Sequence, residues 1–232
     1  MRVEPHSLDS FVHVTKRGTR GLPIVRDIAD KRRFVRLLYY ANDQYRDYFW
    51  ESNTSGLGEF GRPDHWPPQE PLVKILAWSL MPNHFHLVLK ELIEGGISKF
   101  MQQLCGSMSM HFNKKYDEKG SIFQGSYKGR TANTRGDEYL RLLAVYVMVK
   151  NPFELYPGGL KNAIKHFDTA YAWASKHPLC SLGDYAQEKA SLIVDKDIFG
   201  EVFDTPQKLK SFAKELLLYK LEQLNTVDTK SQ

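Results

Sequence analysis

The chain has 232 residues, of which 42% are hydrophobic and 25% charged, a composition typical of a folded protein and not of a disordered one. No apolar run approaches the roughly 20 residues needed to cross a bilayer, and the N-terminus lacks the apolar core of a signal peptide. Cys105 and Cys180 lie far apart and neither forms a CxxC pair, so a disulfide scaffold or zinc ribbon is not supported. We therefore expect a reducing, cytoplasmic setting.

The basic excess is confined to one part of the chain. The net charge is +5, and residues 1–150 carry 22 Lys and Arg against 16 Asp and Glu, whereas residues 151–232 carry 10 against 11. Any anionic partner is therefore expected to bind the first two-thirds of the chain. A net charge of this size is common, so by itself it indicates nucleic acid only weakly.

The N-terminal part predicts a strand followed by a helix. Residues 10–16 alternate in polarity and predict a strand, and residues 27–50 carry apolar side chains at helical spacing, with Asp27 or Asp30 as N-cap. Residues 52–71 are rich in Gly and Pro and predict an irregular loop, which at this length is often functional or mobile.

Further elements follow after this loop. Two apolar runs, residues 72–80 and 84–90, are joined by Met81-Pro82-Asn83 and predict a hairpin, and residues 97–116 predict a helix. Residues 121–131 fit a strand or an extended loop. The order predicts an α+β fold of ferredoxin-like type, an antiparallel sheet with helices on one face.

The next segment, residues 134–150, predicts a helix. It begins with a capping-box-like Thr134/Asp137 pair and ends before Asn151-Pro152, although its last residues, AVYVMV, also have strand propensity. The tail holds short helices, the last near residues 205–224.

Two histidines stand two residues apart in the second strand of the predicted hairpin. Strand geometry places His84 and His86 on one face and Phe85 on the other. Two neutral imidazoles can bind one divalent cation, but the HxH pattern alone is weak. Polar surface residues or satisfied core histidines fit it as well, and a metal site needs a third donor.

Tyr146 is the candidate nucleophile. Its place on the stripe of the predicted helix fits a half-buried core tyrosine equally well. A phenol has a pKa near 10, so attack at neutral pH requires a nearby cation or a metal on the substrate.

Four segments together resemble a known family. HVTKRG (residues 13–18), LMPNHFHLVLK (80–90), SIFQGSYK (121–128) and YLRLLAVYVMVKNP (139–152) are similar to the motifs of the single-tyrosine HUH transposases. MPNHFHL is the most specific of them. The tail segment HPLCSLGDY is similar to the extension of the REP-associated branch of that family.

This resemblance implies a catalytic domain of the HUH type over residues 1–152 and a helical C-terminal extension over residues 153–232. It implies a metal-dependent single-stranded DNA endonuclease and strand transferase that acts at DNA hairpins. His84 and His86 would hold Mg²⁺ or Mn²⁺, and Tyr146 would form a 5′-phosphotyrosine link. The extension favours a monomer over a dimer, in the cytoplasm and associated with the nucleoid.

The sequence departs from the family pattern in the residues that follow Tyr146. The family has Gln or Asn four residues after the tyrosine as the third ligand, whereas here that position is Lys150 and Asn151 is one residue later. Either the helix contains a one-residue bulge or the third ligand differs. We expect Asn151 as the third metal ligand and Lys150 as a phosphate contact.

Basic residues beside aromatic ones suit single-stranded DNA, although each fits a solvated surface charge equally well. The candidate DNA contacts are Lys16, Arg17, Arg20, Lys128, Arg130 and Lys150.

Two other functions fit parts of the sequence. A host-adopted protein could bind hairpin DNA with weak or no cleavage, as the irregularity at Lys150 allows. A ferredoxin-like RNA- or DNA-binding module with structural histidines is less well supported, since the aromatic motif of RRM domains is missing. If Tyr146 is not the nucleophile, Tyr139 and Tyr127 are the next candidates.

Overall fold

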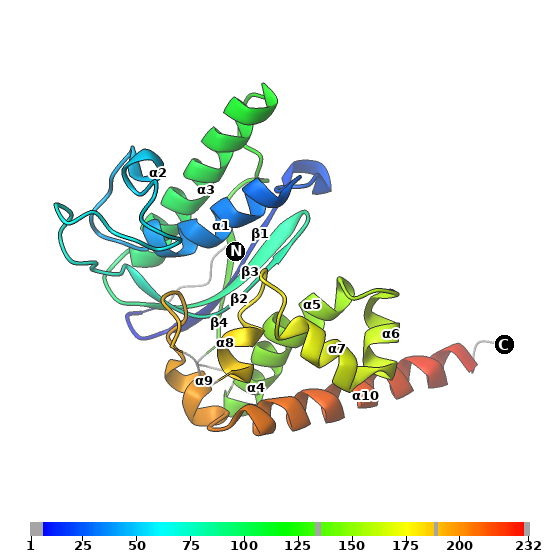
Figure 1. Cartoon of the computed structure of the whole chain (residues 1–232). Coiled ribbons are helices and arrows are strands. Elements are labelled where there is room, and N and C mark those ends of the chain that lie inside the picture. Colours follow the sequence, from blue (N-terminus) through cyan, green and yellow to red (C-terminus); the bar gives the residue numbers. More distant parts are fainter. Residues whose placement is uncertain (1–6, 133–135, 188–189, 230–232) are drawn as a thin grey trace. The chain divides into compact units, whose positions relative to one another are not determined.

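A computed structural model describes residues 7–132, 136–187 and 190–229 of the chain (Figure 1). Packing divides it into two compact units: Met1–Ile75 with Pro82–Ala132, and Leu76–Met81 with Asn133–Gln232. The expected division into residues 1–152 and 153–232 follows the family resemblance and stays a prediction. Within the described ranges, no helix combines the length and apolar character that a membrane span requires.

A four-stranded sheet organises the first unit. Its strands are β1 (Phe11–Arg17), β2 (Val73–Met81), β3 (His84–Glu91) and β4 (Lys128–Thr131). They lie in the order β2-β3-β1-β4, and β1 pairs antiparallel with both β3 and β4. With one long helix between β1 and β2 and another between β3 and β4, this order is ferredoxin-like, and the predicted fold class is confirmed. β4 covers only the end of the segment for which a strand or loop was expected.

The predicted hairpin is present, with a two-residue turn at Pro82-Asn83. The chain after β1 holds this turn in place. The Gly18 N–H donates to the Asn83 carbonyl at 2.7 Å, and the Ile24 N–H donates to the Pro82 carbonyl at 2.8 Å. A Cβ on Gly18 would lie 2.1 Å from the Leu22 carbonyl oxygen, so only glycine fits there. The turn that precedes His84 is therefore tightly constrained.

Helices α1 (Ile28–Tyr40) and α3 (Gly96–Tyr116) pack against each other and cover one face of the sheet (Figure 1). Phe34 of α1 contacts Phe85 of β3, with ring centroids 5.1 Å apart, and both side chains are fully buried. Asp27 caps α1 as predicted, in a capping box with Asp30. The face of β3 that carries Phe85 thus points into a core.

The helix expected over residues 27–50 is shorter than predicted. It ends at Tyr40, and only the short α2 (Trp50–Asn53) follows. The reason is Asn42, whose side chain accepts the N–H groups of Leu72 and Val73 and donates to the Val73 carbonyl. These bonds tie the chain to the start of β2 in place of another helical turn.

The Gly- and Pro-rich loop that follows is packed rather than extended. Arg62 forms an ion pair with Asp43 at 2.8 Å, and Trp66 is buried against the rings of Tyr40 and Tyr45. Trp66 thus packs within the loop, whereas the neighbouring His65 is exposed.

The second unit is helical in all its described elements apart from the part of β2 that it contains. The tyrosine segment is α4 (Gly136–Val145), a π-helical turn (Tyr146–Lys150) and α5 (Asn151–Glu154). The later helices are α6 (Gly159–Lys165), α7 (Phe167–Ala174), α8 (Leu182–Ala186), α9 (Asp197–Val202) and α10 (Pro206–Thr229). The choice of helix over strand for residues 134–150 is confirmed from Gly136 onward. The Thr134 cap lies outside the described residues.

The helix does not end at Asn151-Pro152 as predicted, because a π turn accommodates the proline. The Asn151 N–H donates to the Tyr146 carbonyl, five residues back. Proline has no N–H and its ring crowds the carbonyl four residues before it, so a regular helix is disfavoured there. The wider turn lets the helix continue to Glu154, and it is the one-residue bulge that the spacing of Tyr146 and Asn151 suggested.

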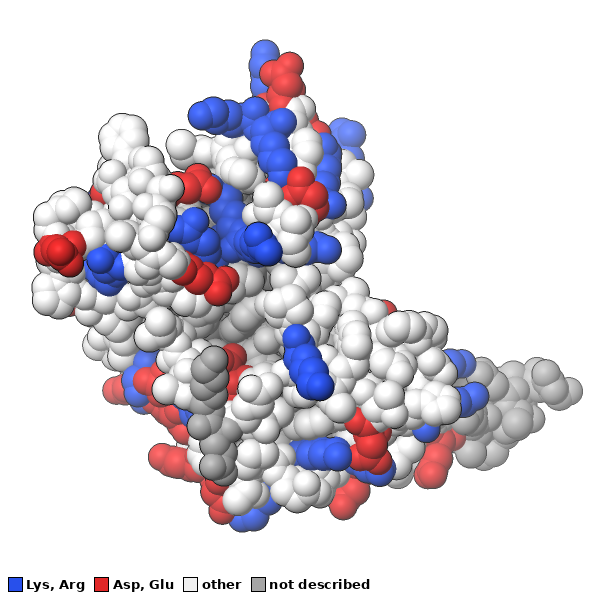
Figure 2. Space-filling view, viewed as in Figure 1, with Lys and Arg blue, Asp and Glu red and all other residues white. Residues whose placement is uncertain are grey.

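Basic side chains are spread over more than one surface of the first unit. Figure 2 shows Lys and Arg side chains gathered over α1 and α3, the helices on the apolar side of the sheet. Charge alone therefore does not locate a site for an anionic partner.

Candidate metal and DNA site

The sheet register places both histidines on one face of the first unit together with several cations. Thr15 of β1 lies opposite His86 on one side and Lys128 on the other, and Arg17 lies opposite His84. Directly opposed residues of paired strands share a face. Arg130 joins the same face, because it lies opposite His13, two residues from Thr15. We call this surface the histidine face; it carries His13, Thr15, Arg17, His84, His86, Lys128 and Arg130.

Each candidate ligand has a hydrogen-bond partner at its Nδ1 atom. His84 Nδ1 lies 2.7 Å from Asn83 Oδ1, and the Asn83 amide also donates to the Gly21 carbonyl. Because a carbonyl oxygen only accepts, this contact places the proton of a neutral His84 on Nδ1. That leaves Nε2 as the coordinating atom, the usual arrangement of metal-binding histidines. The two imidazole centroids lie 5.0 Å apart.

His86 is buried, and its Nδ1 contacts two side chains of β1. His13 Nε2 lies 2.9 Å away and Thr15 Oγ1 lies 3.2 Å away. The centroids of the His13 and His86 rings lie 5.2 Å apart, and the ring planes are inclined by 19°. Burial, with a smaller contribution from the positive charge of Arg130, lowers the pKa of His13 to about 4. His13 is therefore a neutral imidazole at physiological pH.

A polar hollow opens beside the histidines. It has a volume of about 240 Å³ and is lined by Thr15, Arg17, Gln124, Gly125, Ser126 and Lys128. Arg17 and Lys128 are exposed and come from different strands, so two cations converge on a space large enough for a phosphate group. The structure therefore brings two of the predicted DNA contacts together beside the predicted ligands.

The other predicted contacts of β1 and its turn are placed differently. Lys16 alternates to the opposite face, is 7% exposed and donates to the Gly125 carbonyl. Burial lowers its pKa. Its ammonium therefore binds the loop that residues 124–126 form, and it is not exposed for contact with a ligand. Arg20 is exposed in the turn after β1, at a φ of 57°.

In the second unit, the π turn separates the three predicted residues. Tyr146 is 37% exposed, and the Lys150 ammonium lies 5.2 Å from the centroid of its ring. Lys150 also forms an ion pair with Glu154. Asn151 is 2% exposed, and its amide donates to Ser79 Oγ at 3.1 Å. Lys150, rather than Asn151, thus accompanies the tyrosine ring.

The donor set fits a divalent cation that also takes ligands from its substrate. Two imidazoles with fixed Nδ1 atoms are suitable protein ligands. Across the described part of the chain, no cluster of three or more His, Cys, Asp and Glu side chains could hold a metal ion. The remaining positions would therefore be filled by an amide, water or the oxygens of a bound phosphate.

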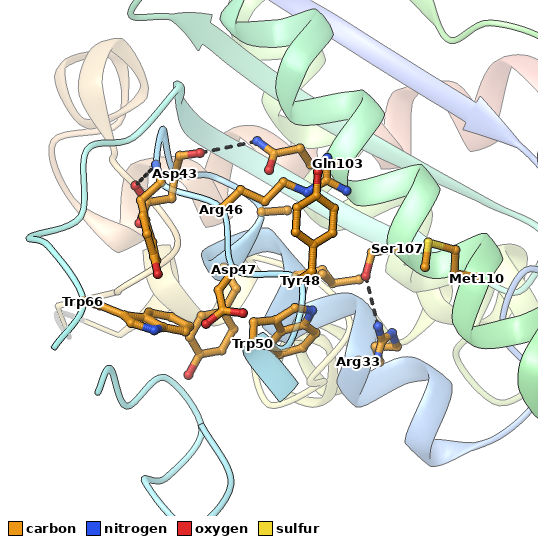
Figure 3. A pocket seen from close by; sticks show the side chains of 14 residues that line it. Arg33, Asp43, Arg46, Asp47, Tyr48, Trp50, Trp66, Gln103, Ser107 and Met110 are labelled. Carbon is orange, nitrogen blue, oxygen red and sulfur yellow. Dashed lines mark hydrogen bonds between the residues drawn. The ribbon is translucent and has the colours of Figure 1, made fainter. Parts of the chain in front are cut away.

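A second pocket lies on the helical side of the first unit (Figure 3). It is lined by aromatic side chains, among them Tyr48, Trp50 and Trp66, and by Arg33 and Arg46. None of the residues of the histidine face lines it. The irregular loop therefore builds a separate pocket with α1 and α3.

Sequence reasoning missed two residues of the histidine face, His13 and Thr15. Both belong to the alternating pattern of residues 10–16, and His13 opens the HVTKRG segment. The sequence therefore contains these two residues in a recognisable pattern, but their proximity to His86 follows only from the register that pairs Thr15 with His86.

The sequence and the fold were compared with known proteins. A family model described as "Transposase IS200 like" matches residues 69–149. No curated protein matches the chain. A solved structure of a REP-associated tyrosine transposase bound to a REP hairpin is similar at a TM-score of 0.44 and 12% identity, over 84% of this chain and 90% of that one.

A structural likeness this distant says nothing about individual residues. The family match is more informative, because it contains His84, His86 and Tyr146 and ends just before Lys150 and Asn151. The segment that carries the two histidines and the tyrosine is therefore similar to the IS200-like transposases.

Proposed function

We propose that the protein is a metal-dependent endonuclease and strand transferase that acts on single-stranded DNA at hairpins. The observation that carries this proposal is the histidine face. It combines two imidazoles fixed at Nδ1 with a hollow that two exposed cations line. A phosphodiester bound there would meet positive charge on one side and the metal ligands on the other.

The chemical step is a transesterification at phosphorus. The phenolate oxygen of Tyr146 forms a bond to the phosphorus, and the bond from phosphorus to the 3′-oxygen breaks. The 3′-oxygen leaves as a hydroxyl after taking up a proton, and the DNA is left with a 5′-phosphotyrosine link. Attack by another 3′-hydroxyl reverses the step, so no external energy source is required.

Each residue of the proposed site has a separate role. His84 and His86 would hold Mg²⁺ or Mn²⁺, which when bound supplies charge stabilisation at the scissile phosphate. Arg17, Lys128 and Arg130 would neutralise neighbouring phosphates. Lys150, whose ammonium lies over the ring of Tyr146, would contact the phosphate that the tyrosine attacks.

Covalent trapping tests the proposal. The protein is incubated with Mn²⁺ and end-labelled single-stranded hairpin DNA, and products are separated under denaturing conditions. A protein–DNA adduct is expected with the wild type, and its loss is expected in Tyr146→Phe and in His86→Ala. Tyr139→Phe and Tyr127→Phe are the matched controls that should keep it. An adduct that survives Tyr146→Phe would mean that another residue is the nucleophile.

The same assay tests the expected monomer. If one chain supplies both the tyrosine and the histidines, a mixture of Tyr146→Phe and His86→Ala proteins forms no adduct. A restored adduct would show that the tyrosine helix acts in a second copy of the chain.

A host-adopted hairpin-binding protein is the alternative, and the departure at Lys150 is the observation that favours it. Tight hairpin binding without any adduct in Mg²⁺ or Mn²⁺ would support it over the enzyme.

A further inference from the structure

We propose that His13 is a positioning residue for the metal site: its Nε2 accepts the proton of His86 Nδ1 and so keeps the coordinating nitrogen of His86 unprotonated. This inference rests on the proposed function, because it concerns the ligand role of His86. Neither the family match nor the sequence motifs assign a role to His13.

The contact between the two rings is close and specific. His13 Nε2 lies 2.9 Å from His86 Nδ1, within the usual range of a hydrogen bond between ring nitrogens. The two ring planes are inclined to each other by 19°. β1 supplies His13 and β3 supplies His86, so the pairing of two adjacent strands fixes both side chains.

The tautomer of His86 decides whether it can bind a cation. A neutral imidazole carries one proton, and only the nitrogen without it has a lone pair for the metal. A proton on Nδ1 leaves Nε2 ready to coordinate, whereas a proton on Nε2 blocks it. An acceptor held at Nδ1 therefore prepares the ligand before the metal arrives.

Thr15 is the second group at the same nitrogen. Its hydroxyl lies 3.2 Å from His86 Nδ1 and can either accept a proton from that atom or donate one to it. Without His13, Thr15 alone would permit both tautomers. His13 Nε2 accepts from His86 when the proton of the His13 ring is on Nδ1, and this is the tautomer that the proposal assigns to His13.

Three variants separate this role from a packing role. His13→Phe keeps a ring of similar shape but removes the acceptor. His13→Gln removes the ring but places a carbonyl oxygen near the position of Nε2. Thr15→Val removes the second partner. His65→Phe, a change at an exposed histidine outside the histidine face, is the matched control.

Two measurements are made on the full chain. The first is the dissociation constant of Mn²⁺, followed by electron paramagnetic resonance. Removal of an outer hydrogen-bond partner typically weakens metal binding by about 10- to 100-fold, and this loss is expected for His13→Phe. A substantial recovery is expected for His13→Gln, and no change for His65→Phe. The second is the tautomer of His86 without metal, read from ¹⁵N shifts in long-range NMR spectra. The proton is expected on Nδ1 in the wild type and on both nitrogens in His13→Phe.

The outcomes distinguish failure of this inference from failure of the proposed function. If the wild type binds no Mn²⁺, or His86→Ala binds it as well as the wild type, the metal site itself is wrong. If His86→Ala abolishes binding but His13→Phe leaves both the affinity and the tautomer unchanged, only the role of His13 is overturned. Equal losses in His13→Phe and His13→Gln, with the His86 tautomer unchanged in both, would show that His13 acts through packing. Hairpin binding in EDTA, measured in parallel, shows whether each variant keeps its fold.

Discussion

The two faces of the sheet in the first unit differ sharply in chemistry, although the same strands build both. On the face covered by α1 and α3, Val12, Val14 and Phe85 are fully buried. On the histidine face, β1 carries His13, Thr15 and Arg17, and β3 carries His84 and His86. The alternation of a strand therefore lets β1 and β3 hold a core on one side and a polar site on the other.

Lys16 is an exception, because it is a charged residue on the apolar face of the sheet. It belongs by register to the apolar face, opposite Phe85, and its ammonium lies 5.6 Å from the Phe123 ring centroid. Its side chain reaches past the core to the Gly125 carbonyl. A lysine and an arginine adjacent in sequence thus have different roles, one structural and one available to a ligand.

The largest effect is expected from Phe85→Ala. Phe85 is fully buried and contacts Phe34 and Phe123, so its loss should lower the free energy of unfolding by about 3–5 kcal/mol. His84→Ala, one residue away on the half-exposed face, should change it by about 0.5 kcal/mol or less. Urea unfolding in EDTA measures both. Equal losses would mean that the histidine face is as much a part of the core as its opposite.

The contrast between the two faces explains which elements could be predicted from the sequence alone. Alternation and helical stripes predicted β1, the hairpin and α3, because these patterns depend only on local burial. The end of α1 was missed, because Asn42 stops it through bonds to Leu72 and Val73, thirty residues away in sequence.

The same limit applies to the candidate site. The i, i+2 rule placed His84 and His86 on one face, and the spacing of Tyr146 and Asn151 indicated a bulge that is present as the π turn. The partners of His86 were not predictable, because they depend on the register between strands 73 residues apart in sequence. The role of Lys16 likewise follows from its contact with Gly125 across the fold.

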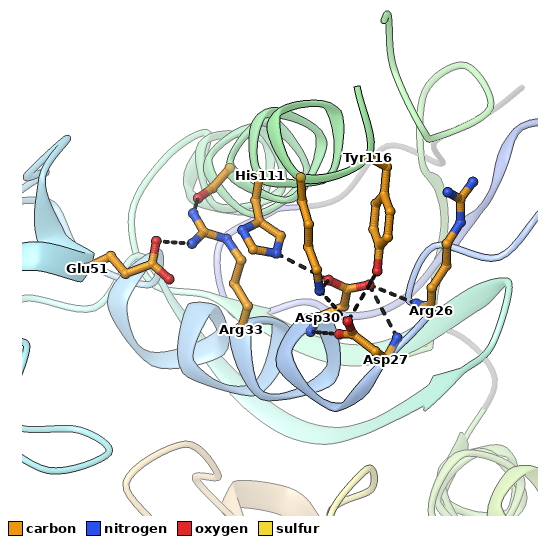
Figure 4. Close-up of polar contacts among 9 residues, drawn as sticks. Arg26, Asp27, Asp30, Arg33, Glu51, His111 and Tyr116 are labelled. Atoms are coloured by element: carbon orange, nitrogen blue, oxygen red, sulfur yellow. Dashed lines mark hydrogen bonds and ion pairs between the residues drawn. The ribbon is translucent and has the colours of Figure 1, made fainter. Parts of the chain in front are cut away.

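The next effect concerns an ionic cluster on the helical side of the sheet (Figure 4). The Asp30 carboxylate is fully buried between α1 and α3. It accepts hydrogen bonds from Lys115 at 2.7 Å, Tyr116 at 2.8 Å and the Arg26 N–H at 2.8 Å, and His111 lies 3.2 Å away. Burial opposes ionisation, but these contacts outweigh it and hold the pKa of Asp30 well below its usual range.

Asp30→Asn should therefore lower the free energy of unfolding by about 3 kcal/mol at pH 7, since it removes the buried negative charge that accepts these hydrogen bonds, although Lys115 keeps its ion pair with Asp27. A depressed pKa adds stability that is full above the unfolded value of 3.8 and is lost as the pH falls below it. The difference between wild type and variant should therefore shrink below about pH 4. Urea titrations from pH 2.5 to 7 measure it. A difference independent of pH would show that packing, not charge, is lost.

A smaller effect tests Asn151, which has a structural partner and a proposed metal role. The Asn151 amide donates to Ser79 inside the second unit, so Asn151→Ala and Ser79→Ala should each cost about 1–2 kcal/mol in urea unfolding. Only Asn151→Ala should weaken Mn²⁺ binding if Oδ1 is the third ligand. Equal Mn²⁺ affinity in the two variants would remove Asn151 from the ligand set.

The smallest effect uses the neighbours Lys16 and Arg17 to compare the two faces directly. Hairpin DNA binding in EDTA is measured by fluorescence anisotropy between 50 and 300 mM salt. Each phosphate contact removed should reduce the slope of log K against log salt by about 0.7 to 0.9, so Arg17→Ala and Lys128→Ala should each show this loss. Lys16→Met should keep the slope, because its ammonium is buried at Gly125.

Comparison of the salt slopes of these variants separates the loss of a phosphate contact from a general loss of DNA affinity. A variant that disturbs the fold lowers the affinity at every salt concentration by a similar factor, whereas loss of a phosphate contact changes the slope. A reduced slope in Lys16→Met and an unchanged one in Arg17→Ala would reverse the assignment. The DNA would then contact the side of the sheet on which Lys16 lies, and the histidine face would not hold the phosphates.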